Sequence, residues 1–183
     1  MRKLILVASV ALALAAGFKA GLTAKDFTAP TTTNATCSVY FSPKGGCTEA
    51  VVHELNQAKS TVLVQAYSFT SLPIAKALVE AHRRGVDVRV ILDKSQRTER
   101  YSSADFVAHA GIPTLIDARH AIAHNKILIL DEQTVITGSF NFTKAAEESN
   151  AENLLILRDS ELAKRYTENW RVHEKHSERY EGR

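Results

Sequence analysis

The fold and the chemistry of this chain are indicated by two neighbouring segments, His124-Asn125-Lys126-Ile127-Leu128-Ile129-Leu130-Asp131 and Gly138-Ser139-Phe140-Asn141. The four apolar residues inside the first segment predict a strand that is covered on both faces. Alternate side chains of a strand share a face, so the spacing places the imidazole of His124 beside the ammonium of Lys126. The same spacing places the hydroxyl of Ser139 beside the amide of Asn141. If the two strands are neighbours, the four polar groups converge.

These four groups suit the cleavage of a phosphodiester. Negative charge on the phosphate repels nucleophiles and increases in the transition state, so fixed hydrogen-bond donors are needed. Lys126 supplies a cation, and Ser139 and Asn141 supply neutral donors. A neutral imidazole of His124 can attack phosphorus and form a covalent intermediate that water later opens. The leaving oxygen needs a proton, which a second, protonated histidine can supply.

The pattern of residues 124–131 and 138–143, together with Glu152 in Ser-Asn-Ala-Glu-Asn, resembles the signature of the phospholipase D superfamily. More narrowly, the chain resembles the small exported bacterial endonucleases of that superfamily, which carry one copy of the motif. The resemblance covers roughly residues 38–175. It implies an α/β sandwich and hydrolysis of a phosphodiester.

The resemblance also implies a role for each matching residue. His124 would be the nucleophile or its acid partner, Glu152 would orient a histidine, and Asp131 would support the motif structurally. Phosphate would be bound by Lys126, Ser139 and Asn141. Nothing in the sequence resembles the acidic cluster that holds magnesium in two-metal nucleases, so we expect no catalytic metal and no cofactor.

A site that uses two such histidines needs two copies of the histidine motif, but this chain contains one H-x-K-x-x-x-x-D pattern. We therefore predict an obligate homodimer in which His124 of each chain meets the other at one shared site. His120, four residues earlier, is an alternative acid within the same chain, and is otherwise expected to be a surface residue. His173 and His176 lie in a charged terminal segment and are expected to be solvated.

The first residues predict a secretory signal. An apolar stretch from Leu4 to Phe18 follows a positively charged start and ends at Lys19. It is shorter than the about 20 apolar residues of a membrane span, although an uncleaved anchor is an alternative. We expect a signal peptide over residues 1–24, a periplasmic or secreted protein, and no membrane span after cleavage. Residues 25–36 predict a polar tether, and residues 37–183 a single domain.

The chain has two cysteines, Cys37 and Cys47. In an exported protein, the even count and the short separation favour a disulfide that joins the first strand to the start of the first helix. Two buried free thiols are the alternative. Two cysteines alone make a poor metal site.

Net charge does not argue for a nucleic-acid ligand. The formal charge is +3, and three basic residues of the predicted signal peptide account for it. Any electrostatic groove must therefore be local. Residues 94–101 form a polar segment after a predicted strand, and either contact backbone phosphates or form a solvated loop. The candidate DNA contacts in this segment are Lys94, Arg97 and Arg100.

Apolar periodicity predicts alternating strands and helices along the rest of the chain. Strands are expected near 38–41, 61–66, 86–92, 113–116, 126–130, 133–138 and 153–157. Helices are expected near 48–58, 73–84, 102–110 and 160–176. The alternation predicts an α/β fold with a mixed, mostly parallel sheet and helices on both faces. In the last helix, a stripe of Leu162, Tyr166 and Trp170 is expected to face the core.

Three functions compete for this pattern. An exported, non-specific endonuclease that cleaves DNA, with RNA as a further possible substrate, is the leading hypothesis. A phospholipid phosphodiesterase would use the same chemistry, but no amphipathic stretch beyond the signal segment demands a lipid surface. A non-catalytic protein could hold a metal with His120, His124 and Asp131, although their spacing and Lys126 between them disfavour such a site.

Overall fold

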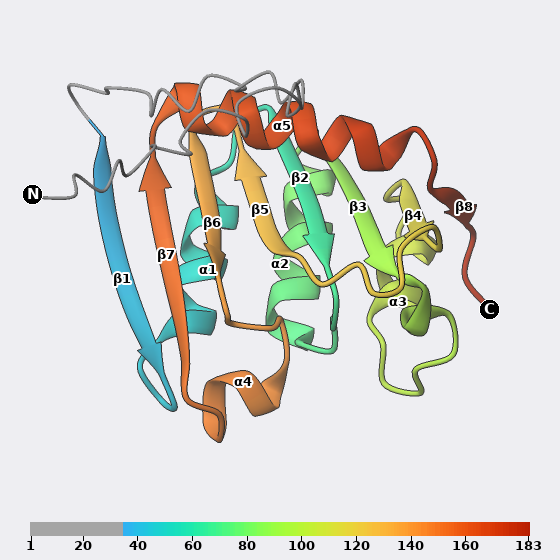
Figure 1. Ribbon diagram of the computed structural model, residues 1–183, viewed down its shortest axis with the longest axis horizontal. Coiled ribbons are helices and arrows are strands. Elements are labelled where there is room, and N and C mark those ends of the chain that lie inside the picture. The colour runs from blue at the N-terminus through green and yellow to red at the C-terminus, as the bar shows by residue number, and fades with distance from the viewer. Residues whose placement is uncertain (1–34) are drawn as a thin grey trace, which may run out of the picture.

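The computed structural model describes residues 35–183, and these form one eight-stranded sheet with helices on both faces (Figure 1). The predicted signal peptide and nearly all of the predicted tether lie outside the described residues. The strands are β1 (Thr36–Ser42), β2 (Thr61–Ala66), β3 (Asp87–Asp93), β4 (Thr114–Asp117), β5 (Lys126–Leu130), β6 (Thr134–Gly138), β7 (Glu152–Arg158) and β8 (Glu178–Tyr180). The helices are α1 (Cys47–Gln57), α2 (Leu72–Arg83), the 3-10 helix η1 (Lys94–Arg97), α3 (Ala104–His109), α4 (Lys144–Glu148) and α5 (Ser160–Glu174).

The strand order across the sheet is β1-β7-β6-β5-β2-β3-β4-β8. The α/β class, the mixed sheet and the helices on both faces are confirmed, but the expectation of mostly parallel strands is wrong. Two of the seven strand pairings are parallel, β2 with β3 and β3 with β4. Parallel pairing needs a long crossover, which α2 and α3 provide. The short turn between β5 and β6 instead forces an antiparallel hairpin.

The core has two layers, one on each face of the sheet. The larger layer lies under α1, α2 and α3. The smaller lies under α5, where the buried indole N–H of Trp170 donates a hydrogen bond to the backbone oxygen of Val64 at 2.9 Å. Strand β5 is buried along its whole length, as its apolar run predicts. Trp170 therefore fixes α5 on the face of the sheet opposite α1, α2 and α3.

The expected disulfide between Cys37 and Cys47 is wrong, since both residues are free thiols. Cys37 is the second residue of β1, and β1 ends at Ser42, about 16 Å further along the strand. Cys47 begins α1 shortly after that distant end, whereas a disulfide needs its Cα atoms within about 7 Å. Burial, helped by the charge of Glu147, raises the pKa of the Cys47 thiol to about 11.

Within residues 35–183, no helix combines the length and the apolar character that crossing a bilayer requires.

Candidate active site

The polar residues of the motif gather at one edge of the sheet, the lower edge in Figure 1. At this edge β2 ends and β5 begins, with Ala66 paired to Lys126. Strand β6 ends there at Gly138, and β7 begins there at Glu152. Strand direction therefore brings together five of the predicted site residues: His124, Lys126, Ser139, Asn141 and Glu152.

His124 and Lys126 are held against the ring of Tyr67. His124 is exposed in the loop before β5, and its ring centroid lies 4.6 Å from that of Tyr67. Lys126 is 7% exposed, and its Nζ lies 5.2 Å from the same centroid. Lys126 Nζ also donates a hydrogen bond to the backbone oxygen of His124 at 2.8 Å. The two groups are therefore neighbours, with the lysine inside and the histidine at the surface.

The ammonium of Lys126 is desolvated. Burial lowers its pKa below the ordinary lysine value, and the charge of Glu152 opposes that shift. A desolvated cation interacts more strongly with an anion than a solvated one does. Lys126 is thus suited to hold a phosphate oxygen, and the carboxylate of Glu152 is close enough to influence it.

The segment after β6 explains why the motif contains glycine. The backbone oxygen of Asn153 accepts hydrogen bonds from the N–H groups of Ser139 and Phe140 at 3.1 and 3.2 Å. A Cβ atom at Gly138 would lie 2.3 Å from that oxygen, and the φ of Gly138 is 149°. A side chain at this position would therefore prevent β7 from packing this closely against Gly138. Phe140, the next residue but one, is completely buried.

The side chains of Ser139 and Asn141 follow the end of β6. Ser139 Oγ accepts hydrogen bonds from the backbone N–H and the Nδ2 group of Asn153, at 3.1 and 3.3 Å. Its own proton remains available to an anion. Asn141 is half-buried, and its Oδ1 has no hydrogen-bond partner within the part of the chain that the structure describes. Both residues lie in irregular backbone after β6 rather than in a strand.

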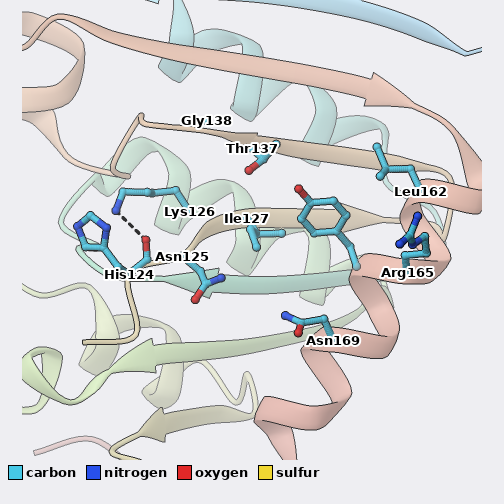
Figure 2. A pocket seen from close by; sticks show the side chains of 10 residues that line it. His124, Asn125, Lys126, Ile127, Thr137, Gly138, Leu162, Arg165 and Asn169 are labelled. Carbon is cyan, nitrogen blue, oxygen red and sulfur yellow. Dashed lines mark hydrogen bonds between the residues drawn. The ribbon is translucent and has the colours of Figure 1, made fainter. Parts of the chain in front are cut away.

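A pocket of about 510 Å³ opens beside His124 and Lys126 (Figure 2). One wall comes from the loop before β5 and from β5 and β6, and the other comes from α5. The residues of α5 that line it are Leu162, Arg165, Tyr166 and Asn169. The sequence does not single out Arg165 or Asn169, because an exposed cation and amide four residues apart occur on most surface helices. The expectation of a core stripe is confirmed, because Trp170 is buried and the half-buried Leu162 and Tyr166 pack against the same core cluster. Leu162 and Tyr166 also form part of the pocket wall.

Asp131 is not brought to the site. It follows β5 at the opposite edge of the sheet, about 16 Å from Lys126 along the strand. Its carboxylate accepts hydrogen bonds of 2.8 to 3.2 Å from the N–H groups of Lys59, Ser60 and Thr61 and from the Ser60 hydroxyl. These bonds join the β5–β6 turn to the start of β2, which fits structural support rather than contact with the reacting groups.

We expect Asp131→Ala to lower the free energy of unfolding by about 2 kcal/mol, because several backbone donors lose a charged acceptor. Burial alone would raise the pKa of Asp131, but the hydrogen bonds lower it below its ordinary value. Because the pKa is lower in the folded than in the unfolded state, Asp131 stabilises the protein at a pH above its unfolded pKa of about 3.9. This stabilisation is lost as the pH falls through the folded pKa. Urea unfolding at pH 7 and pH 3 should show the difference shrinking in acid. Glu132→Ala is the matched control, since Glu132 is exposed and shares the positive φ of Asp131.

The candidate DNA contacts follow β3, whose end lies at the same edge as His124, but none of them lines the pocket. Lys94 donates a hydrogen bond to the backbone oxygen of His120 at 3.1 Å. Arg97 forms an ion pair with Glu178, which neutralises its charge. Arg100 is exposed, and its guanidinium lies 5.5 Å from the ring centroid of Tyr101.

His120 does not line the pocket either, so the structure gives no support to an acid from the same chain. It lies beside Asp117, His173 and His176. The expectation that His173 and His176 are solvated is wrong, because their side chains are 15% exposed. The hypothetical metal site of His120, His124 and Asp131 is not formed, since Asp131 lies at the opposite edge of the sheet.

Comparison with known proteins agrees with this geometry. A family model described as "Cardiolipin synthase, PLD-like domain" matches residues 51–172. The chain is 43% identical to a phospholipase D of Rickettsia conorii over 133 residues, which are 73% of this chain and 66% of that protein. It is 33% identical to a mitochondrial cardiolipin hydrolase of Mus musculus, over 64% of this chain and 53% of that protein. The crystal structure of Nuc, a phospholipase D family member from Salmonella typhimurium, matches with a TM-score of 0.78 and 39% identity, over 80% of this chain and 99% of that one.

The α/β fold, with a histidine, a lysine and neutral donors at one sheet edge, defines the class of phosphodiester hydrolases to which these relatives belong. The chain belongs to the phospholipase D superfamily. It spans 66% of the length of the curated Rickettsia conorii relative.

Proposed function

We propose that this chain is an exported endonuclease, periplasmic or secreted, that hydrolyses DNA and accepts RNA as a further substrate. One observation carries the proposal. An exposed histidine and a buried lysine meet at a pocket whose far wall presents a cation and an amide, Arg165 and Asn169. That combination suits a phosphate in a nucleic-acid strand, which has further phosphates on either side of the bond that is cut.

In the proposed reaction, a ring nitrogen of His124 attacks phosphorus and forms a P–N bond. The bond from phosphorus to the leaving oxygen breaks, and a second, protonated histidine donates its proton to that oxygen. Water then attacks the phosphohistidine and gives a proton to the second histidine, which restores both rings. The phosphate oxygens are held throughout by Lys126, Ser139 and Asn141.

A second copy of the chain would supply the second histidine. Among residues 35–183, His124 is the one histidine that lines the pocket. Ile122, two residues before it, is an apolar side chain that is 56% exposed, which suits burial between two chains. The match to Nuc covers 99% of that chain, so the Nuc chain consists of one domain of this kind.

Phospholipid is the alternative substrate. It is favoured by the names of two relatives, a phospholipase D and a mitochondrial cardiolipin hydrolase. Leu72, which begins α2 near the site, is 49% exposed and could contact a lipid surface together with Ile122. Against this, the pocket wall that faces solvent on α5 is polar at Arg165 and Asn169.

The substrate test compares supercoiled plasmid with vesicles of phosphatidylcholine and cardiolipin, at 25 °C and with a strong chelator present. We expect cleavage of plasmid and little release from vesicles. Arg165→Ala should weaken DNA binding at all sequences and reduce the slope of log affinity against log salt by about 1. Lys164→Ala is the matched control, because Lys164 is an exposed neighbour that does not line the pocket. Faster turnover of vesicles than of plasmid would instead favour the lipid function.

A further inference from the structure

Four side chains that take no part in the proposed reaction converge elsewhere in the fold. Asp117 is the last residue of β4 and is completely buried. His120 lies in the loop that leads to β5, His173 lies in the last turn of α5, and His176 follows that helix. One potential ligand atom of each residue lies within 4.8 Å of all the others.

The distances fit a small coordination shell. Asp117 Oδ2 lies 2.7 Å from Nδ1 of His173 and 3.7 Å from Nε2 of His120, and Oδ1 lies 3.3 Å from Nε2 of His176. The three imidazole centroids are 5.0 to 5.3 Å apart. Ligand atoms in a zinc tetrahedron, with bonds of 2.0 to 2.1 Å, are roughly 3.3 Å apart. The distances from the Asp117 oxygens differ from this value by about 0.6 Å or less, and all four ligand atoms lie within 4.8 Å of one another. Shifts of up to about 1.5 Å would therefore give a tetrahedron.

An ordinary ion pair does not account for this cluster. Asp117 already has an aligned bond with one imidazole, that of His173, yet two more imidazoles are gathered around the same carboxylate. Nε2 of His176 is buried and lies 3.3 Å from Oδ1 of Asp117, but it makes no aligned hydrogen bond within the residues that the structure describes. The carboxylate is also oriented by the N–H of Arg119, which donates to Oδ1 at 3.1 Å, as an outer contact of a metal ligand would be.

The sequence spacing is compatible with chelation. Asp117 and His120 are three residues apart, and so are His173 and His176. Pairs with two intervening residues are common among zinc ligands, and residues three apart at the end of a helix share a face. Neutral imidazoles with one carboxylate are ligands that zinc accepts readily.

We propose that Asp117, His120, His173 and His176 bind one zinc ion in a structural site. The four protein ligands would complete a tetrahedron and leave no position for substrate. The ion would join the end of β4, the loop before His124 and the end of α5. This site goes beyond the proposed function, because none of its ligands lines the pocket. It also differs from the catalytic magnesium that the sequence disfavours.

The test uses purified protein that has been stripped with a strong chelator and then titrated with Zn²⁺ alone. We expect one zinc per chain, and a thermal unfolding midpoint that rises with free zinc, as linkage requires. Co²⁺ in the same site should show the visible absorption of tetrahedral cobalt. Asp117→Asn and His176→Ala should weaken zinc binding at least about tenfold and abolish the zinc-dependent shift.

Two further variants keep the test decisive. His120→Ala removes the most exposed ligand, 44% exposed, and covers the case in which Asp117→Asn does not fold. His53→Ala is the matched control, because His53 is exposed on α1 outside the cluster. Zinc uptake that is the same in all variants, or no uptake by the wild type, would overturn the proposal.

The outcome is separable from that of the proposed function. His124→Ala should lose phosphodiester turnover and retain zinc. Asp117→Asn should lose zinc and retain turnover at 25 °C, below its unfolding transition. If one of these two results is not obtained, the other still tests its own proposal.

Discussion

His124→Ala is expected to reduce hydrolysis of plasmid DNA by a factor on the order of 10⁴ or more, because the covalent step loses its nucleophile. His124 is exposed in a loop, so the free energy of unfolding should change by less than about 0.5 kcal/mol. Nicking of plasmid and urea unfolding measure the two effects. His53→Ala, another exposed histidine, should match the wild type in both. Cleavage by the His124 variant within tenfold of the wild-type rate would exclude this role.

The same variant tests whether two chains share one site. If each site needs His124 from both chains, a mixed dimer is inactive. Equal amounts of wild type and variant, after subunit exchange, should then retain about one quarter of the wild-type activity expected for the total protein. Independent sites would retain about one half. Labelled protein from a reaction that is quenched in progress should also contain acid-sensitive phosphohistidine in the wild type and none in His124→Ala.

Lys126→Met is expected to lower kcat by about 10² to 10³, the usual effect of removing one preorganised donor to a developing anion. Methionine has nearly the length of lysine without its charge. Lys126 is buried and its pKa is lowered by desolvation, so the charge is costly in the folded protein. The free energy of unfolding should therefore stay at or above the wild-type value. Steady-state kinetics on plasmid and urea unfolding check the two expectations.

Lys144→Met is the matched control for this substitution, because Lys144 is an exposed lysine whose ammonium lies 3.6 Å from Glu148 on α4. It should leave kcat unchanged. If Lys126→Met lost activity only together with several kcal/mol of stability, the lysine would be a packing residue rather than a phosphate ligand.

The motif strand could be predicted from the sequence because it depends on local pattern. The apolar run of residues 126–130 coincides with β5, and the apolar run within 61–66 coincides with β2. Polar residues at strand ends could also be assigned to one site, since strand direction alone determines which ends meet.

Features that depend on tertiary packing could not be predicted in this way. The three residues of β8 and the five of α4 are too short for a periodic signal. The antiparallel half of the sheet depends on which strands become neighbours, and local pattern does not specify that. The pocket wall at Arg165 and the cluster around Asp117 both require α5 to lie across the sheet, so neither could be read from spacing alone.

Trp170 gives the protein a built-in optical reporter. It is the single tryptophan of the chain, it is 1% exposed, and it holds α5 on the sheet. That helix carries both the outer wall of the pocket and His173. Detachment of α5 would move the indole into water and shift its fluorescence emission to longer wavelength. Intrinsic fluorescence can therefore follow the docking of this helix directly, without an attached dye.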